Sequence, residues 1–228
     1  MKKLFYILMV AGLFFGSTSC EGDEPASDQS QAETPDNGGN DNDGENENNN
    51  PENPNPAEGD ILVVYYSYTN NTHTIVTDLL TQIEADVVRV EPAEKGLDYA
   101  ANNYALGSAL IAAIRENPND ASSYPAIDPV DVELENYATV IVAAPLWWSN
   151  MAAPLQTFLF NHGSEMAGKN IGLIVSSASS GISGVEADAR RLIPDGNFLT
   201  PSLWIRSSQT SNCHEMTAEW LKDTGLIE

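Results

Sequence analysis

Uninterrupted apolar stretches alternate with segments of helical periodicity between residues 61 and 228. Most of the apolar stretches are rich in Val and Ile, which is typical of strands buried on both faces of a parallel sheet. We expect five strands, at residues 61–66, 86–90, 139–144, 170–176 and 198–205. In the intervening segments apolar residues recur every three or four positions, which predicts helices. We expect these helices at residues 72–83, 99–116, 153–162, 185–193 and 213–222.

This alternation predicts an α/β fold, in which a parallel sheet is covered by helices on both faces. Residues 61–228 have the length of one domain and show no internal repeat. We expect the third strand to end at Pro145, because proline cannot donate a hydrogen bond to a sheet. Ligands of open α/β sheets bind beyond the carboxyl ends of the strands, so the loops that follow the strands are the first candidates for chemistry.

The loop after the first strand is rich in hydroxyl and amide side chains. Ser67, Thr69 and Thr72 carry hydroxyls, Asn70 and Asn71 carry amides, and the loop contains no acid. Such a loop at a helix N-terminus can hold a phosphate through backbone N–H groups, hydroxyls and the helix dipole. It has neither the Walker pattern nor Gly-x-Gly-x-x-Gly, which argues against a nucleoside triphosphatase or a dinucleotide-binding fold. A polar turn that only caps the helix is the alternative interpretation.

Two adjacent tryptophans follow the third strand, in the segment Pro145, Leu146, Trp147 and Trp148. An aromatic ring at this place can cover one face of a planar heterocycle and exclude water from it. Packing of both tryptophans against the next helix is the alternative. The loop after the fourth strand, residues 176–181, offers small side chains and backbone donors, which is a weak signal when taken alone.

In this order the three loops resemble those of the flavodoxin family, and the likeness covers essentially all of residues 61–225. The resemblance implies a flavodoxin-like three-layer sandwich whose five-stranded parallel sheet has the order 2-1-3-4-5, with flavin mononucleotide (FMN) as cofactor. It also implies the cofactor contacts. The phosphate contacts would be Ser67, Thr69, Asn71 and Thr72, in a loop that includes Asn70. The ring contacts would be Pro145, Leu146, Trp147 and Trp148 on one side, and Ser177, Ala178, Ser179, Ser180 and Gly181 on the other.

Two segments depart from the family pattern. Asn70 stands where the family usually has glycine, and asparagine tolerates a left-handed backbone better than most residues. The serine-rich loop 177–181 stands where similar members more often have two glycines. This second departure bears on the fit of the flavin ring more than on the phosphate site.

Three functions are compatible with these residues. The first is electron transfer by a bound flavin, to a redox partner protein or a small-molecule acceptor. The second is an FMN-dependent reductase that passes hydride from a nicotinamide to a quinone-type acceptor, with a cleft formed by Tyr99, Tyr104 and the segment 92–137. The third is a flavodoxin-shaped binding module that has lost the flavin, as the departures at Asn70 and in the loop 177–181 would allow.

The N-terminus has the layout of a secretory signal. Lys2 and Lys3 precede an apolar run from residue 4 to 15, which is too short to span a bilayer. The small residues before Cys20 resemble the lipobox of bacterial lipoproteins, although Ser17 stands where an aliphatic residue is usual. We therefore expect residues 1–19 to be a lipoprotein signal peptide and Cys20 to be lipidated. An ordinary signal peptide with an incidental cysteine is the alternative.

Composition separates an acidic tether, residues 20–60, from the domain at 61–228. The tether contains Asp, Glu, Asn, Gly and Pro but no Lys, Arg or aromatic residue, so we expect it to be disordered. The chain has 33 acidic and 10 basic residues, for a net charge of −23, which argues against nucleic acid and against electrostatic binding to an anionic membrane. We expect the protein to be located in the cell envelope and to be attached to the membrane only through its lipid anchor. The acidic run after Cys20 resembles signals for export to the outer cell surface, and a plain solvated linker is the alternative.

The remaining reactive residues do not suggest other chemistry. Lipidation of Cys20 leaves Cys213 without a disulfide partner. His73, His162 and His214 lack the spacing of metal ligands, so we expect no metal site. No Gly-x-Ser-x-Gly segment is present, which argues against an esterase.

Overall fold

The structure is a computed structural model that describes residues 60–228. The predicted signal peptide 1–19, the lipidation site Cys20 and nearly all of the predicted tether lie outside the described residues. None of the helices in residues 60–228 has both the length and the hydrophobicity that crossing a membrane requires.

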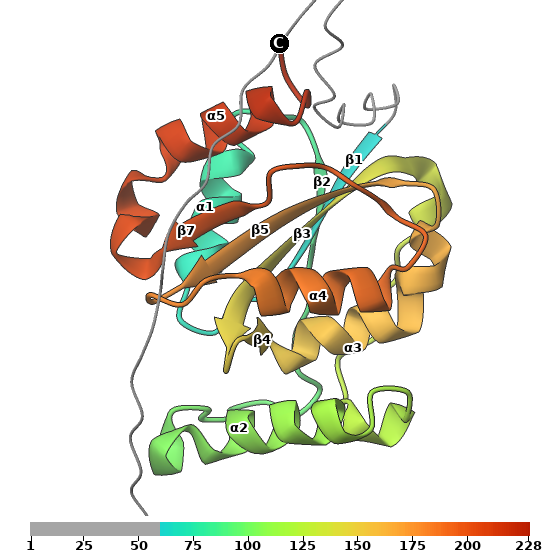
Figure 1. The fold of residues 1–228 in the computed structure, drawn as a ribbon, viewed down its shortest axis with the longest axis vertical. Helices are drawn as coiled ribbons and strands as arrows, with labels where there is room; N and C mark the ends of the chain where they lie inside the picture. The colour runs from blue at the N-terminus through green and yellow to red at the C-terminus, as the bar shows by residue number, and fades with distance from the viewer. Residues whose placement is uncertain (1–59) are drawn as a thin grey trace, which may run out of the picture. The chain divides into compact units, whose positions relative to one another are not determined.

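A parallel sheet forms the middle layer of residues 60–228 (Figure 1). Its strands lie in the spatial order β2, β1, β3, β5 and β6, with β7 also paired to β5. Their bounds are β2 Asp86–Arg89, β1 Asp60–Tyr65, β3 Tyr137–Trp147, β5 Asn170–Ser177, β6 Asn197–Phe198 and β7 Leu203–Arg206. This arrangement confirms the predicted flavodoxin-like α/β fold and its strand order.

Helices cover both faces of the sheet (Figure 1). Helices α1 (Asn71–Leu79) and α5 (His214–Asp223) pack on one face, and α3 (Ala153–His162) and α4 (Ser183–Leu192) pack on the other with α2 (Ala101–Glu116). The described residues also form four short 3-10 helices, at Ala121–Ser123, Leu134–Asn136, Gly163–Met166 and Ser207–Asn212. Because the central strands are apolar on both faces, each face must be covered by helices, which gives three layers.

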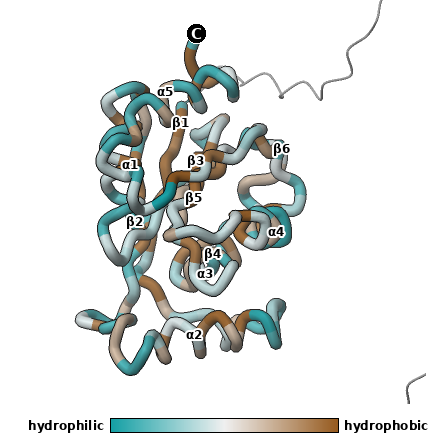
Figure 2. The backbone as a smooth tube through the Cα atoms, turned by 60° about the vertical axis from the view of Figure 1, so that its left-hand side comes forward, coloured by the Kyte–Doolittle hydropathy of each residue, from teal (hydrophilic) through white to brown (hydrophobic). Residues whose placement is uncertain are grey.

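The register of the central strands explains the two cores. On β1 the side chains of Leu62 and Val64 enter one core, and that of Val63 enters the other, because successive residues of a strand point to opposite faces. All three are fully buried. Figure 2 shows the hydrophobic residues concentrated along β1 and β3. Uninterrupted apolar stretches were therefore a sound signal for these strands.

Two predicted strand boundaries are wrong. The strand expected at 198–205 is divided into β6 and β7 by the segment 199–202, where Pro201 has no N–H to donate to the sheet. Strand β3 does not end at Pro145 but continues to Trp147 and forms a hairpin with β4 (Asn150–Met151). Proline lacks only the donor, and its carbonyl oxygen accepts a hydrogen bond from the N–H of Ala152 at 3.1 Å.

Candidate functional site

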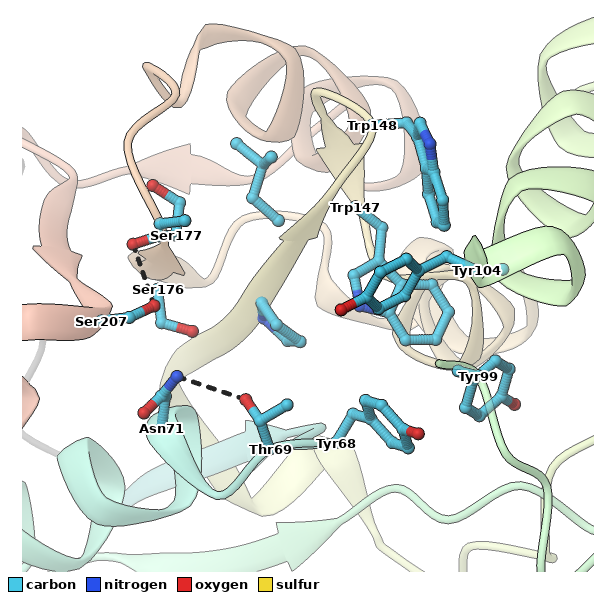
Figure 3. Close-up of a pocket in the computed structure, with 14 residues that line it drawn as sticks. Tyr68, Thr69, Asn71, Tyr99, Tyr104, Trp147, Trp148, Ser176, Ser177 and Ser207 are labelled. Carbon is cyan, nitrogen blue, oxygen red and sulfur yellow. Dashed lines mark hydrogen bonds between the residues drawn. The ribbon is translucent and has the colours of Figure 1, made fainter. Parts of the chain in front are cut away.

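A cavity of about 310 Å³ opens at the carboxyl ends of β1, β3 and β5 (Figure 3). One end is lined by hydroxyl and amide side chains and the other by aromatic rings, and no lining residue carries a charge. The hydroxyl and amide side chains belong to Thr69, Asn71, Ser176, Ser177 and Ser207, and Ala178 lies next to Ser177 in the lining. The remaining lining residues are Tyr68, Tyr99, Tyr104, Gly107, Pro145, Leu146, Trp147 and Trp148. This division matches a ligand that has an anionic group and a planar ring.

The polar end lies at the start of α1. Asn70 precedes the helix in a left-handed conformation, with φ of 64°, as expected where glycine is usual. Asn71 donates from Nδ2 to the Thr69 hydroxyl at 3.2 Å (Figure 3). Within residues 60–228 the backbone N–H groups of Asn71 and Thr72 have no acceptor, as is usual in a first helical turn. These donors and the helix dipole can bind an anion without Lys or Arg.

Two of the predicted phosphate contacts do not line the cavity. The Ser67 hydroxyl accepts a hydrogen bond from the N–H of His73 at 3.2 Å, so it satisfies the first turn of α1. The Thr72 side chain is buried, and its hydroxyl lies 2.8 Å from that of Ser176, which does line the cavity. Both hydroxyls therefore stabilise the conformation of the loop through hydrogen bonds outside the cavity.

Trp147 is the centre of the aromatic end. Its ring meets those of Tyr66 and Tyr68 edge to face, with centroids 5.7 and 6.5 Å apart, and lies against Tyr99 at 4.8 Å. Trp148 is 41% exposed and meets Tyr104 edge to face at 6.5 Å. Trp147 is thus fixed by packing on several sides, whereas Trp148 lies at the mouth of the cavity (Figure 3).

The turn that carries the tryptophans has an unusual backbone. Trp148 and Ser149 connect β3 to β4 with φ of 46° and 66°. Two-residue hairpins with positive φ at both central positions normally have sequences such as Asn-Gly, since side chains disfavour this conformation. The sequence gives no turn signal here, which is why the hairpin was not predicted.

Tyr68 was not expected in the site, although it belongs to the phosphate loop. Its hydroxyl donates to Oδ1 of Asp98 at 3.0 Å. The pKa of the Asp98 carboxyl is lowered, first by a hydrogen bond from the N–H of Ala100 and then by that from Tyr68. The carboxylate is therefore charged at neutral pH and holds the Tyr68 ring at the edge of the cavity.

The aromatic end also contains phenols that remain neutral. Tyr99 is 3% exposed, and its hydroxyl has no hydrogen-bond partner among the residues that the structure describes. Burial is the main cause that raises the pKa of Tyr99, and it raises the pKa of Tyr66 even further. Neither ring therefore brings charge to this end of the site at physiological pH.

The first part of α2 forms one side of the mouth of the cavity. The helix predicted at 99–116 is α2, which begins at Ala101, and its residues Asn102, Asn103 and Tyr104 are in a left-handed conformation with φ between 51° and 62°. Further along the helix, Gly107 lies so close to Trp148 that a β-carbon would be 2.8 Å from the indole. Tyr99 and Tyr104, expected to form a cleft beside the ring, do line the cavity.

The loop after β5 forms the opposite wall. The Ser177 hydroxyl donates to the carbonyl of Ser180 at 3.0 Å and accepts from Nε1 of Trp204 at 2.8 Å. The carbonyl of Ser177 accepts from the Ser207 hydroxyl at 3.2 Å (Figure 3). Ser177 and Ala178 line the cavity, whereas the other predicted loop contacts are exposed and do not. Those others are Ser179, Ser180 and Gly181.

Ser207 was missed because the last strand was placed too early. It directly follows β7, so its position at the carboxyl end of a strand was the available signal. Within residues 60–228 the structure brings together no group of three or more His, Cys, Asp or Glu that could hold a metal ion.

The cavity lies where the strand order of the sheet reverses, between β1 and β3. This position and the sheet order define a flavodoxin-type α/β protein. The chain belongs to the flavodoxin family, whose model, described as Flavodoxin, matches residues 60–224. No curated protein matches the chain.

Solved structures show the same fold. A candidate flavoprotein from Bacteroides eggerthii DSM 20697 is 22% identical, with a TM-score of 0.58 over 74% of this chain and 99% of its own. Another from Bacteroides uniformis ATCC 8492 is 23% identical, with a TM-score of 0.56 over 72% and 98%. A flavoprotein from Lactobacillus acidophilus NCFM, in complex with FMN, is 18% identical, with a TM-score of 0.54 over 68% and 97%.

Proposed function

We propose that this protein binds FMN in the cavity at the ends of β1, β3 and β5 and serves as an electron-transfer protein. The observation that carries the proposal is a single uncharged cavity with anion donors at one end and aromatic rings at the other. The volume of about 310 Å³ is in the range of small-molecule sites. The FMN complex of the Lactobacillus acidophilus relative supports the choice of cofactor.

The residues present fit this cofactor. The phosphate would be held by the first turn of α1, by Thr69 and Asn71, and by the hydroxyls of Ser176 and Ser207. The ring would lie between the aromatic side chains and the wall formed by Ser177 and Ala178. The flavin supplies the redox chemistry, and the protein supplies orientation, exclusion of water and electrostatics.

Charge in this protein acts on the flavin from a distance. The lining contains no charged side chain, while residues 61–228 contain 20 acidic and 8 basic residues. A negative surrounding disfavours the anionic reduced flavin, so we expect a low reduction potential. A donor or acceptor would then be a redox partner protein or a small molecule that approaches the mouth at Trp148.

Titration of the purified protein with FMN tests the proposal. We expect saturable binding with quenched flavin fluorescence, because aromatic rings line the ring end of the cavity. Riboflavin, which lacks the phosphate, should bind at least about tenfold more weakly, the scale of lost charge-assisted hydrogen bonds. No FMN binding at high micromolar concentration would contradict the proposal and would favour a binding module without flavin.

A reductase is the second candidate, favoured by the exposure of Trp148 and Tyr104 at the mouth, where a second planar molecule could approach. Addition of NADH or NADPH and a quinone to the FMN-loaded protein separates the two candidates. Rapid turnover supports a reductase, whereas reduction by dithionite alone supports a carrier.

We also propose that a lipid on Cys20 anchors the protein in the cell envelope. Replacement of Cys20 by Ala should move the protein from the membrane fraction to the soluble fraction, because a lipid chain contributes most of the membrane affinity of such proteins. Cys213→Ala is the matched control, since that thiol is buried in the domain. Equal membrane retention of the Cys20→Ala variant would rule out the anchor.

A further inference from the structure

A strained turn places the two tryptophans of the proposed flavin site. Trp148 and Ser149 both have positive φ, a conformation that costs energy for residues with a side chain. The hairpin has only two paired positions, Leu146 with Met151 and Trp147 with Asn150. A hairpin this short is not stable by itself. Contacts with other parts of the domain must therefore stabilise the turn.

The carboxylate of Asp188 on α4 supplies two of these contacts. Its Oδ2 accepts a hydrogen bond from the backbone N–H of Met151 and another from Nδ2 of Asn150, both at 2.9 Å. Asp188 is 7% exposed and does not line the cavity. The carboxylate therefore binds the second strand of the hairpin without reaching the proposed ligand.

Neighbouring side chains fix the orientation of this carboxylate. Arg191 donates to Oδ1 of Asp188 at 3.3 Å and to the side-chain carbonyl of Gln156 at 2.9 Å. Gln156 in turn donates to the backbone carbonyl of Met151 at 2.7 Å. The backbone N–H and C=O of Met151 are thus both held by one closed network of side chains from α3 and α4.

We propose that Asp188 is a positioning residue that keeps the Trp148–Ser149 turn left-handed and so preorganises Trp147 and Trp148 for the flavin. The part of this inference that concerns FMN rests on the proposed function. The effect of Asp188 on the conformation of the turn does not. Removal of the carboxylate leaves the turn free to relax toward conformations that residues with side chains prefer. The indole of Trp148 would then shift, and Trp147 would keep only its packing against tyrosine side chains.

The test compares Asp188→Asn with Glu186→Gln in the purified protein. Asparagine keeps the size of the side chain, but one of the two acceptor oxygens becomes an NH2 donor, which would face the donors of either Arg191 or the hairpin. We expect FMN affinity to fall about tenfold, and the near-ultraviolet circular dichroism of the tryptophans to change without ligand. Glu186 lies on the same helix and accepts from Ser202 instead, so its variant should stay within about twofold of the parent.

A second substitution separates positioning from general stability. Ser149→Gly makes the left-handed turn easier to form, because glycine has no side chain. When Ser149→Gly is already present, adding Asp188→Asn should therefore lower FMN affinity by less than about threefold. Failure of Ser149→Gly to rescue, or unchanged affinity and dichroism in Asp188→Asn alone, would overturn the proposal. If the parent protein binds no FMN, the proposed function fails, while the dichroism and its rescue still test the role of Asp188.

Discussion

Substitution of Gly184 by alanine is expected to destabilise the protein by about 2–3 kcal/mol, the upper part of the range for overpacking. A β-carbon at this position on α4 would lie 1.9 Å from the backbone carbonyl oxygen of Ser149. No rotamer change relieves such a contact, because both atoms are fixed by the backbone. Either α4 or the Trp148–Ser149 turn must move, so FMN binding should weaken as well.

Urea unfolding followed by circular dichroism measures the change in stability. Gly181→Ala is the control for stability, since a β-carbon there would meet nothing within 4 Å and the backbone φ is not in the left-handed region. That variant should unfold within about 0.5 kcal/mol of the parent. A Gly184→Ala variant as stable as Gly181→Ala would show that α4 and the turn are not in the close contact described.

The strands were predictable because burial on both faces leaves a local signal in the sequence. Val63 and Val64 enter opposite cores, and each needs an apolar side chain whatever the neighbouring strand is. The site loops were predictable in part, since their place after the strands follows from the fold. The side chains that face the cavity were harder to identify, as Ser67 and Thr72 show, because this depends on the rotation of a loop.

The hairpin with the tryptophans was not predictable from local patterns. Its turn contradicts the usual turn residues, and its stability comes from Asp188, which lies 37 positions after Met151. An aspartate on an amphipathic helix gives no sign that its side chain will turn inward. Such local violations are expected at functional sites, where the surrounding structure enforces a conformation that the sequence alone disfavours.

Truncation of Trp147 to alanine should have the largest effect on cofactor binding. The indole contacts Tyr66, Tyr68 and Tyr99 and also lines the cavity, so its loss removes the ring wall and loosens the side chains behind it. We expect FMN affinity to fall by about 30-fold to 100-fold, as several aromatic contacts and their buried area are lost together. Stability should also fall, by about 2 kcal/mol, less than for a fully buried tryptophan.

Trp148→Ala and Trp147→Phe are the matched comparisons. Trp148 is 41% exposed, so its truncation should lower stability by less than about 1 kcal/mol while still changing the quenching of flavin fluorescence. Phenylalanine at 147 keeps an aromatic face against Tyr99 and should retain most of the affinity. FMN titration and urea unfolding of the three variants give both quantities. Equal FMN affinity in Trp147→Ala and the parent would place the flavin ring away from this wall. An equal loss of affinity in Trp147→Phe and Trp147→Ala would show that the size of the indole matters more than its aromatic face.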